Sequence, residues 1–153
     1  MCFACGKYII SFILYRFKGK LIQSNFPYRI RLDDTLWDDS MKYTWTGLLQ
    51  NYNVRLNGRG CVAFACILSD AAFGYDTPAV QIDAPSSDSI RIGDIIRINN
   101  DTHSAMVIGT DGDEFTLAEG NVGIAYNGSF VSVVRWNRKT SKTIAIDYVW
   151  TRW

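Results

Sequence analysis

A change from helix-type to β-type patterning near residue 90 most constrains the fold of this chain. Residues 61–73 contain good helix formers and no proline, and Gly74 follows at the position where a helix would end. Five short runs rich in Ile, Val and aromatic residues come later, separated by Asn, Asp and Gly: 92–98, 104–109, 114–118, 130–136 and 144–150. One helix followed by several antiparallel strands predicts an α+β architecture.

The length and charge of the chain limit the number of domains and the class of partner. Its 153 residues, 48% of them hydrophobic and 20% charged, suffice for one domain with its own core. We expect a single domain over residues 29–153, with residues 1–28 as an N-terminal extension packed on it. The formal net charge of +1 gives no broad attraction to polyphosphate, so nucleic acid is not an expected partner. The oligomeric state is left open.

The N-terminal residues are not expected to span a membrane. The apolar run from Tyr8 to Tyr15 is much shorter than the roughly 20 residues that a membrane-spanning helix requires. Arg16, Lys18 and Lys20 follow this run instead of preceding it, which does not fit a signal peptide. We therefore predict no transmembrane segment and no clear signal peptide.

The four cysteines divide into two pairs, and one of them opens the predicted helix. Cys2 and Cys5 form an isolated C-x-x-C motif without the second pair that a zinc site needs, so we predict no metal. Cys61 and Cys66 lie about 140° apart around a helix and are expected to stay unbonded. At a helix start, unpaired N–H groups and the helix dipole stabilise a thiolate, which makes Cys61 a candidate nucleophile.

The only histidine of the sequence, His103, lies on a predicted β-hairpin. A three-residue loop at 111–113 would place opposite each other the residues whose numbers add to 224. His103 then faces Asn121 and lies diagonally to Glu119, with all three on one face of the sheet. A two-residue loop would shift the register by one and separate these faces, unless a β-bulge restored it.

These residue types predict hydrolysis by a cysteine nucleophile. His103 would take the proton of Cys61 and return it to a leaving amine, while Glu119 or Asn121 would orient the imidazole. This chemistry requires no cofactor. Each residue alone also has an ordinary structural interpretation, because buried cysteines are often small hydrophobes and Glu-Gly-Asn is a common turn.

The order of four motifs resembles the CHAP group, the cysteine, histidine-dependent amidohydrolases/peptidases. The motifs are Gly60-Cys61 at a helix start, Gly93-Asp94-Ile95-Ile96, His103-Ser104-Ala105-Met106-Val107-Ile108 and Ala118-Glu119-Gly120-Asn121. Together they extend over about half of the chain, from residue 58 to residue 136. One departure lies beside the cysteine, where Val62-Ala63-Phe64 replaces the aromatic-rich Thr-Trp-Tyr-like stretch that is frequent in the family.

The resemblance implies a fold, a set of roles and a substrate. The fold is α+β and papain-like, with the nucleophile at the start of a core helix that packs against a mainly antiparallel sheet. Cys61 is then the nucleophile, His103 the general base and acid, Glu119 the orienting residue and Asn121 an accessory polar member. The expected reaction is hydrolysis of an amide bond in peptidoglycan, by an N-acetylmuramoyl-L-alanine amidase or a peptide endopeptidase that is secreted or associated with the cell wall.

Two other functions stay open at this point. The same residues would serve a papain-like protease or amidase that acts as a toxin or effector on a protein or a small molecule. A noncatalytic binding module would keep the fold without the reaction. Without a clear signal peptide, the location is also open between export, cytoplasmic storage and delivery by another route.

Overall fold

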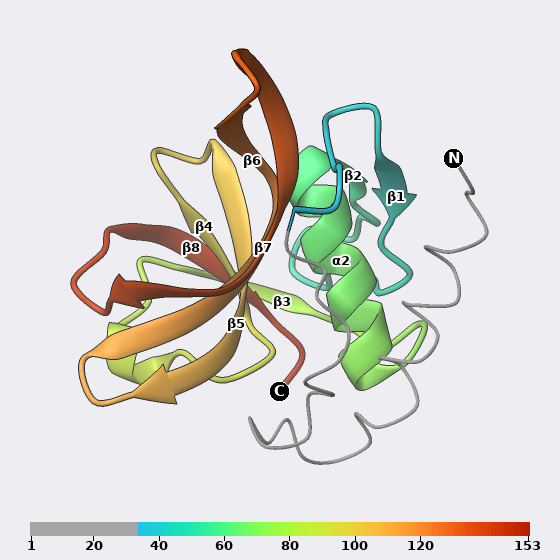
Figure 1. Ribbon diagram of the computed structural model, residues 1–153. Helices are drawn as coiled ribbons and strands as arrows, with labels where there is room; N and C mark the ends of the chain where they lie inside the picture. The colour runs from blue at the N-terminus through green and yellow to red at the C-terminus, as the bar shows by residue number, and fades with distance from the viewer. Residues whose placement is uncertain (1–33) are drawn as a thin grey trace.

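The protein is built around one large antiparallel β-sheet (Figure 1). The structure is a computed structural model that describes residues 34–153. Its main sheet has six strands in the order β3-β8-β4-β5-β6-β7, and each neighbouring pair is antiparallel. The elements are β1 (Lys42–Thr44), β2 (Asn57–Arg59), α2 (Gly60–Phe73), β3 (Val80–Asp83), the 3-10 turn η2 (Ser87–Ser89), β4 (Ile95–Ile98), β5 (His103–Asp111), β6 (Glu114–Tyr126), β7 (Ser129–Ser141) and β8 (Ile146–Thr151).

Apolar side chains cover both faces of the central strands. Phe64 of α2 packs in one cluster with Met106 and Ile108 of β5. The alternate residues of β5, Ala105 and Val107, belong to a second buried cluster. Successive side chains of a strand point to opposite faces, so β5 is buried on both sides and holds a fixed position under the helix.

The fold is β-rich, so the prediction of an α+β papain-like fold with a core helix is wrong. Eight strands and a single α-helix make up the regular structure of residues 34–153, apart from one short 3-10 turn. Many of the strand residues that were not predicted lie in β6 and β7. Each of these strands has 13 residues, where the sequence pattern predicts only 114–118 and 130–136. Their outer parts pair with each other in a largely exposed ribbon (Figure 1). An exposed ribbon has no buried face, and hydrophobic alternation therefore does not reveal it.

The helix itself begins and ends close to the predicted positions. It runs over Gly60–Phe73, against the predicted range 61–73. Gly74 ends it with a φ of 91°, and its N–H donates to the carbonyl of Asp70 at 2.9 Å. A positive φ favours glycine, which explains the stop at this residue. Cys61 and Cys66 are both free thiols, as expected from their separation around the helix.

Some predictions concern residues 1–33, which lie outside the described residues. They are the N-terminal extension over residues 1–28, the expectation of no metal at Cys2 and Cys5, and the interpretation of the run from Tyr8 to Tyr15. Within residues 34–153, no helix has both the length and the apolar character that crossing a membrane requires.

Candidate active site

Cys61 lies in the first turn of α2, directly after β2. The preceding Gly60 has a φ of 49°, and this left-handed backbone allows the strand to turn sharply into the helix. Two contacts fix that turn: the Gly60 N–H donates to the carbonyl of Met41 at 3.0 Å, and Trp37 Nε1 donates to the Gly60 carbonyl at 2.8 Å. The thiol is 8% exposed, so it is nearly buried but still reaches a pocket.

The hairpin between β5 and β6 has a shorter loop than predicted and a bulge that compensates for it. Asp111 pairs with Glu114, so the loop has two residues instead of three. The register then shifts near residue 108, and Met106 pairs with Ala118. This is the pairing expected for the longer loop, because the bulge inserts the one residue that the loop lacks. The histidine at the start of β5 therefore shares a face with the glutamate of β6.

Cys61, His103 and Glu119 form a continuous chain of contacts. His103 Nε2 lies 3.1 Å from Glu119 Oε1. The His103 ring also lowers the pKa of the Cys61 thiol, by hydrogen bonding and by its charge. Because Nε2 contacts Glu119, Nδ1 is the ring nitrogen left to exchange a proton with the sulfur. Cys61 Sγ accepts a further hydrogen bond from the backbone N–H of Ser104 at 3.4 Å. A nucleophile, a base and a carboxylate thus follow one another, as hydrolysis by a thiolate requires.

The electrostatics of the pair favour a thiolate and an imidazolium. Burial alone would raise the pKa of Cys61, but hydrogen bonds from His103 and from the Ser104 N–H outweigh it, and the pKa falls below its ordinary value. Burial would likewise lower the pKa of His103, yet its bonds to Cys61 and Glu119 raise it to about 9. The pKa of the thiol falls and that of the imidazolium rises, and both shifts favour a thiolate–imidazolium ion pair near neutral pH.

An arginine that the sequence analysis did not identify holds the carboxylate of Glu119. Arg138 of β7 binds it with two nitrogens: Nη2 donates to Oε1 at 2.7 Å and Nε donates to Oε2. Burial raises the pKa of Glu119, but its bonds to His103 and Arg138 keep it below the ordinary value. The side chain is only 2% exposed and stays ionised, so it presents a fixed negative charge to the imidazole.

Asn121 lies beside this chain, and its amide has a different partner from the one predicted. Its Nδ2 donates to Asp39 Oδ1 at 2.8 Å. A Cβ on Gly60 would come within 2.8 Å of the same Nδ2, so the amide lies against the residue before Cys61. The geometry indicates that Asn121 ties the Asp39 loop to the start of the helix.

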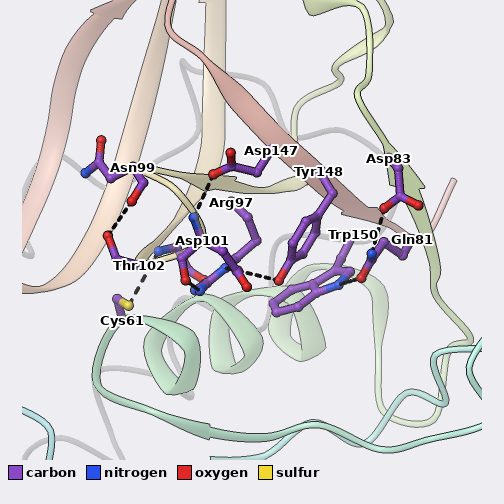
Figure 2. A network of polar contacts seen from close by, with 11 residues as sticks. Cys61, Gln81, Asp83, Arg97, Asn99, Asp101, Thr102, Asp147, Tyr148 and Trp150 are labelled. Atoms are coloured by element: carbon purple, nitrogen blue, oxygen red, sulfur yellow. Dashed lines mark hydrogen bonds and ion pairs between the residues drawn. The ribbon is translucent and has the colours of Figure 1, made fainter.

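The thiol opens onto a pocket of about 440 Å³. Leu56, Val62 and Trp150 form much of its apolar wall, and the buried Arg97 lies at its polar side. Figure 2 shows Cys61 at the N-terminal end of α2, with Arg97, Tyr148 and Trp150 following one another along the helix. Sequence reasoning also missed Arg97, although an arginine inside the apolar run 92–98 is a signal for a buried, paired charge.

The described residues form no metal site, and the comparisons with known proteins found no relative that bears on this site. Among residues 34–153, no group of three or more His, Cys, Asp or Glu side chains is arranged to hold a metal ion. Comparisons with protein-family models, with curated proteins and with solved structures found no match to the chain.

Proposed function

We propose that this protein is a cysteine hydrolase that cleaves amide bonds in bacterial peptidoglycan, as an N-acetylmuramoyl-L-alanine amidase or a peptide endopeptidase. The observation that carries the proposal is the contact chain from the Cys61 sulfur through the His103 ring to the buried Glu119 carboxylate. The choice of peptidoglycan is supported by the order of motifs that resembles the CHAP group.

In the first half of the reaction, the thiolate of Cys61 attacks the carbonyl carbon of the amide. The carbonyl oxygen becomes an oxyanion, and the backbone N–H groups at the start of α2 have no acceptor within the helix and are suited to stabilise it. The imidazolium of His103 then donates its proton to the leaving nitrogen as the carbon–nitrogen bond breaks. The products are an amine and a thioester on Cys61.

In the second half, water replaces the amine. His103, now neutral, takes a proton from the water, and the hydroxide attacks the thioester carbonyl. The carbon–sulfur bond breaks, the acid leaves and the thiolate–imidazolium pair is restored. Glu119 keeps the imidazole in one orientation throughout, because its bonds to Arg138 fix the carboxylate.

Purified cell walls provide the test of this proposal. Cys61→Ala and His103→Ala should each slow the loss of turbidity by about 100-fold or more, the size of a lost nucleophile or general base. Cys66→Ala is the matched control, since Cys66 lies in the same helix but is fully buried and does not line the pocket. Wall lysis by either site variant at the parental rate would contradict the proposal.

Product analysis separates this substrate from the other functions. Mass spectrometry of digested muropeptides should show one new amine and one new carboxylate per cut. If muropeptides stay intact while a panel of proteins or small amides is cleaved, the protein is a protease or amidase with a different substrate. If nothing is cleaved and Cys61 reacts with iodoacetamide as slowly as Cys66, the site is a noncatalytic binding module.

A further inference from the structure

A buried arginine, Arg97, lies near both Cys61 and His103, the two residues of the proposed thiolate–imidazolium pair. Arg97 of β4 is 8% exposed and stands opposite Ser104 of β5. Its Nη1 donates to Ser104 Oγ at 2.6 Å, and the N–H of the same serine donates to Cys61 Sγ at 3.4 Å. Ser104 thus links the guanidinium of Arg97 to the sulfur of the nucleophile.

The same arginine contacts the turn at residues 99–101, which precedes His103 at the start of β5. Residues 99–101 of this turn all have positive φ, with values of 59°, 55° and 60°. Asn and Asp tolerate such a backbone better than other side chains, but three in succession persist only when surrounding contacts hold them. His103 pairs with Ile98 directly after the turn, so the shape of the turn sets where the imidazole begins.

Asp101 makes the hydrogen bonds that fix this turn to the neighbouring strands (Figure 2). Arg97 Nε donates to Asp101 Oδ1 at 2.8 Å, and Arg97 Nη2 donates to the Asp101 carbonyl. The Tyr148 hydroxyl donates to the same carboxylate, and the Asp101 N–H donates to Asp147 Oδ2 at 2.8 Å. Two strands, β4 and β8, therefore contact one residue of the turn, and the buried cation among these contacts is Arg97.

We propose that Arg97 is a positioning residue, which clamps the turn before His103 and supplies a second cation for the Cys61 thiolate. This role rests on the proposed function of Cys61 and His103. The charged groups that face the thiol, line its pocket or lie behind the imidazole are His103, Arg97, Arg59, Asp39, Asp101 and Glu119. The Asp39 carboxylate accepts a hydrogen bond from Asn121, and the Asp101 carboxylate is paired with Arg97. Burial raises the pKa of Cys61, and the charges of His103 and Arg97 act together to lower it.

Alkylation of the full chain with iodoacetamide tests the electrostatic half of this role without any substrate. The rate at Cys61 is followed against pH by mass spectrometry, with fragment spectra that distinguish Cys61 from Cys66. Arg97→Met, which keeps length but removes charge, should slow alkylation near neutral pH on the order of tenfold, because the midpoint of the thiol titration rises. Arg55→Met is the matched control, because Arg55 also pairs with an aspartate, Asp76, but on the exposed surface.

Arg97→Lys tests the positioning half. A lysine keeps the charge but cannot bind Ser104, the Asp101 carboxylate and the Asp101 carbonyl together. Its Cys61 should react with iodoacetamide within about threefold of the parental rate, while wall hydrolysis falls on the order of tenfold because the turn is no longer clamped. This variant also keeps the proposal testable if Arg97→Met does not fold.

The outcomes distinguish this role from the proposed function. A parental Cys61 that reacts quickly near neutral pH, together with unchanged alkylation in Arg97→Met, overturns the electrostatic role alone. Unchanged wall hydrolysis in Arg97→Lys overturns the positioning role. A parental Cys61 that reacts no faster than a reference thiol contradicts the proposed function itself.

Discussion

A buried ion pair between Asp70 of α2 and Arg152 gives a quantitative test of how the helix is held. Asp70 and Arg152 have side chains only 2% and 1% exposed, and Arg152 Nη2 lies 2.7 Å from Asp70 Oδ1. The Asp70 carboxylate also accepts hydrogen bonds from the Tyr43 hydroxyl at 2.6 Å and from Thr46 Oγ1 at 2.8 Å. The guanidinium carbon of Arg152 lies 4.5 Å from the centre of the Trp45 ring. These contacts join the helix to β1, to the segment that follows it and to Arg152 near the C-terminal end of the chain.

Asp70→Asn should destabilise the protein by about 3 kcal/mol. Removing one partner of a buried pair costs about 3 to 5 kcal/mol, because the other charge is left unpaired in the interior. The lower end applies here, since asparagine keeps an oxygen that can accept from Thr46 and the Trp45 ring still attracts the cation. For a chain of this length, about 3 kcal/mol corresponds to a fall in melting temperature of about 10 °C.

Urea unfolding followed by circular dichroism measures this change in the free energy of unfolding. Asp76→Asn is the control, because its partner Arg55 is exposed and the loss should stay below about 1 kcal/mol. In the double variant Asp70→Asn with Arg152→Met, part of the stability should return, since the unpaired charge is removed. A loss below about 1 kcal/mol in Asp70→Asn would refute this account of the ion pair.

Three more predictions concern the site. Glu119→Gln should slow wall hydrolysis by about 10- to 100-fold, because His103 loses a charged partner, and a parental rate would show that the carboxylate is not needed. The pKa of Glu119 is lowered on folding, so its contribution to stability is full above the unfolded value near 4.3 and is lost as pH falls through the folded value. The stability curves of the parent and of Glu119→Gln should therefore approach each other as pH falls below about 4.3, and a constant gap would contradict this. Gly60→Ala should impair folding and hydrolysis together, because its Cβ would lie 2.5 Å from Asp39 Oδ1 at a φ of 49°, and crystallography of an active variant would test this directly.

The helix and its cysteine were predictable from the sequence because their signals are local. A run of helix formers after Gly60 and a stop at Gly74 depend on nearby residues only. The strand content was not predictable to the same degree. Residues 121–129 have no buried side chain and gave no alternation, yet they extend β6 to Tyr126 and begin β7 at Ser129.

The sequence allowed us to predict the residues of the site, but not the side chains that hold them in place. The loop of the β5–β6 hairpin was predicted one residue too long, and the bulge near residue 108 brought the polar residues to one face all the same. Arg97 and Arg138 were missed because each binds a residue on another strand, and such partners follow from the strand order. Asn121 was placed near the site, but its bond to Asp39 depends on a loop without a sequence signal.

The central claim is that Cys61 is a thiolate held by His103 near neutral pH. The ultraviolet absorbance of the thiolate, measured against pH as the difference between the parent and Cys61→Ser, tests this claim most directly. The account predicts a midpoint below the reference thiol value of about 8.5, and a midpoint above that value in His103→Gln, because burial alone raises the pKa of Cys61. A parental midpoint at or above about 8.5 that does not change in His103→Gln would contradict the account.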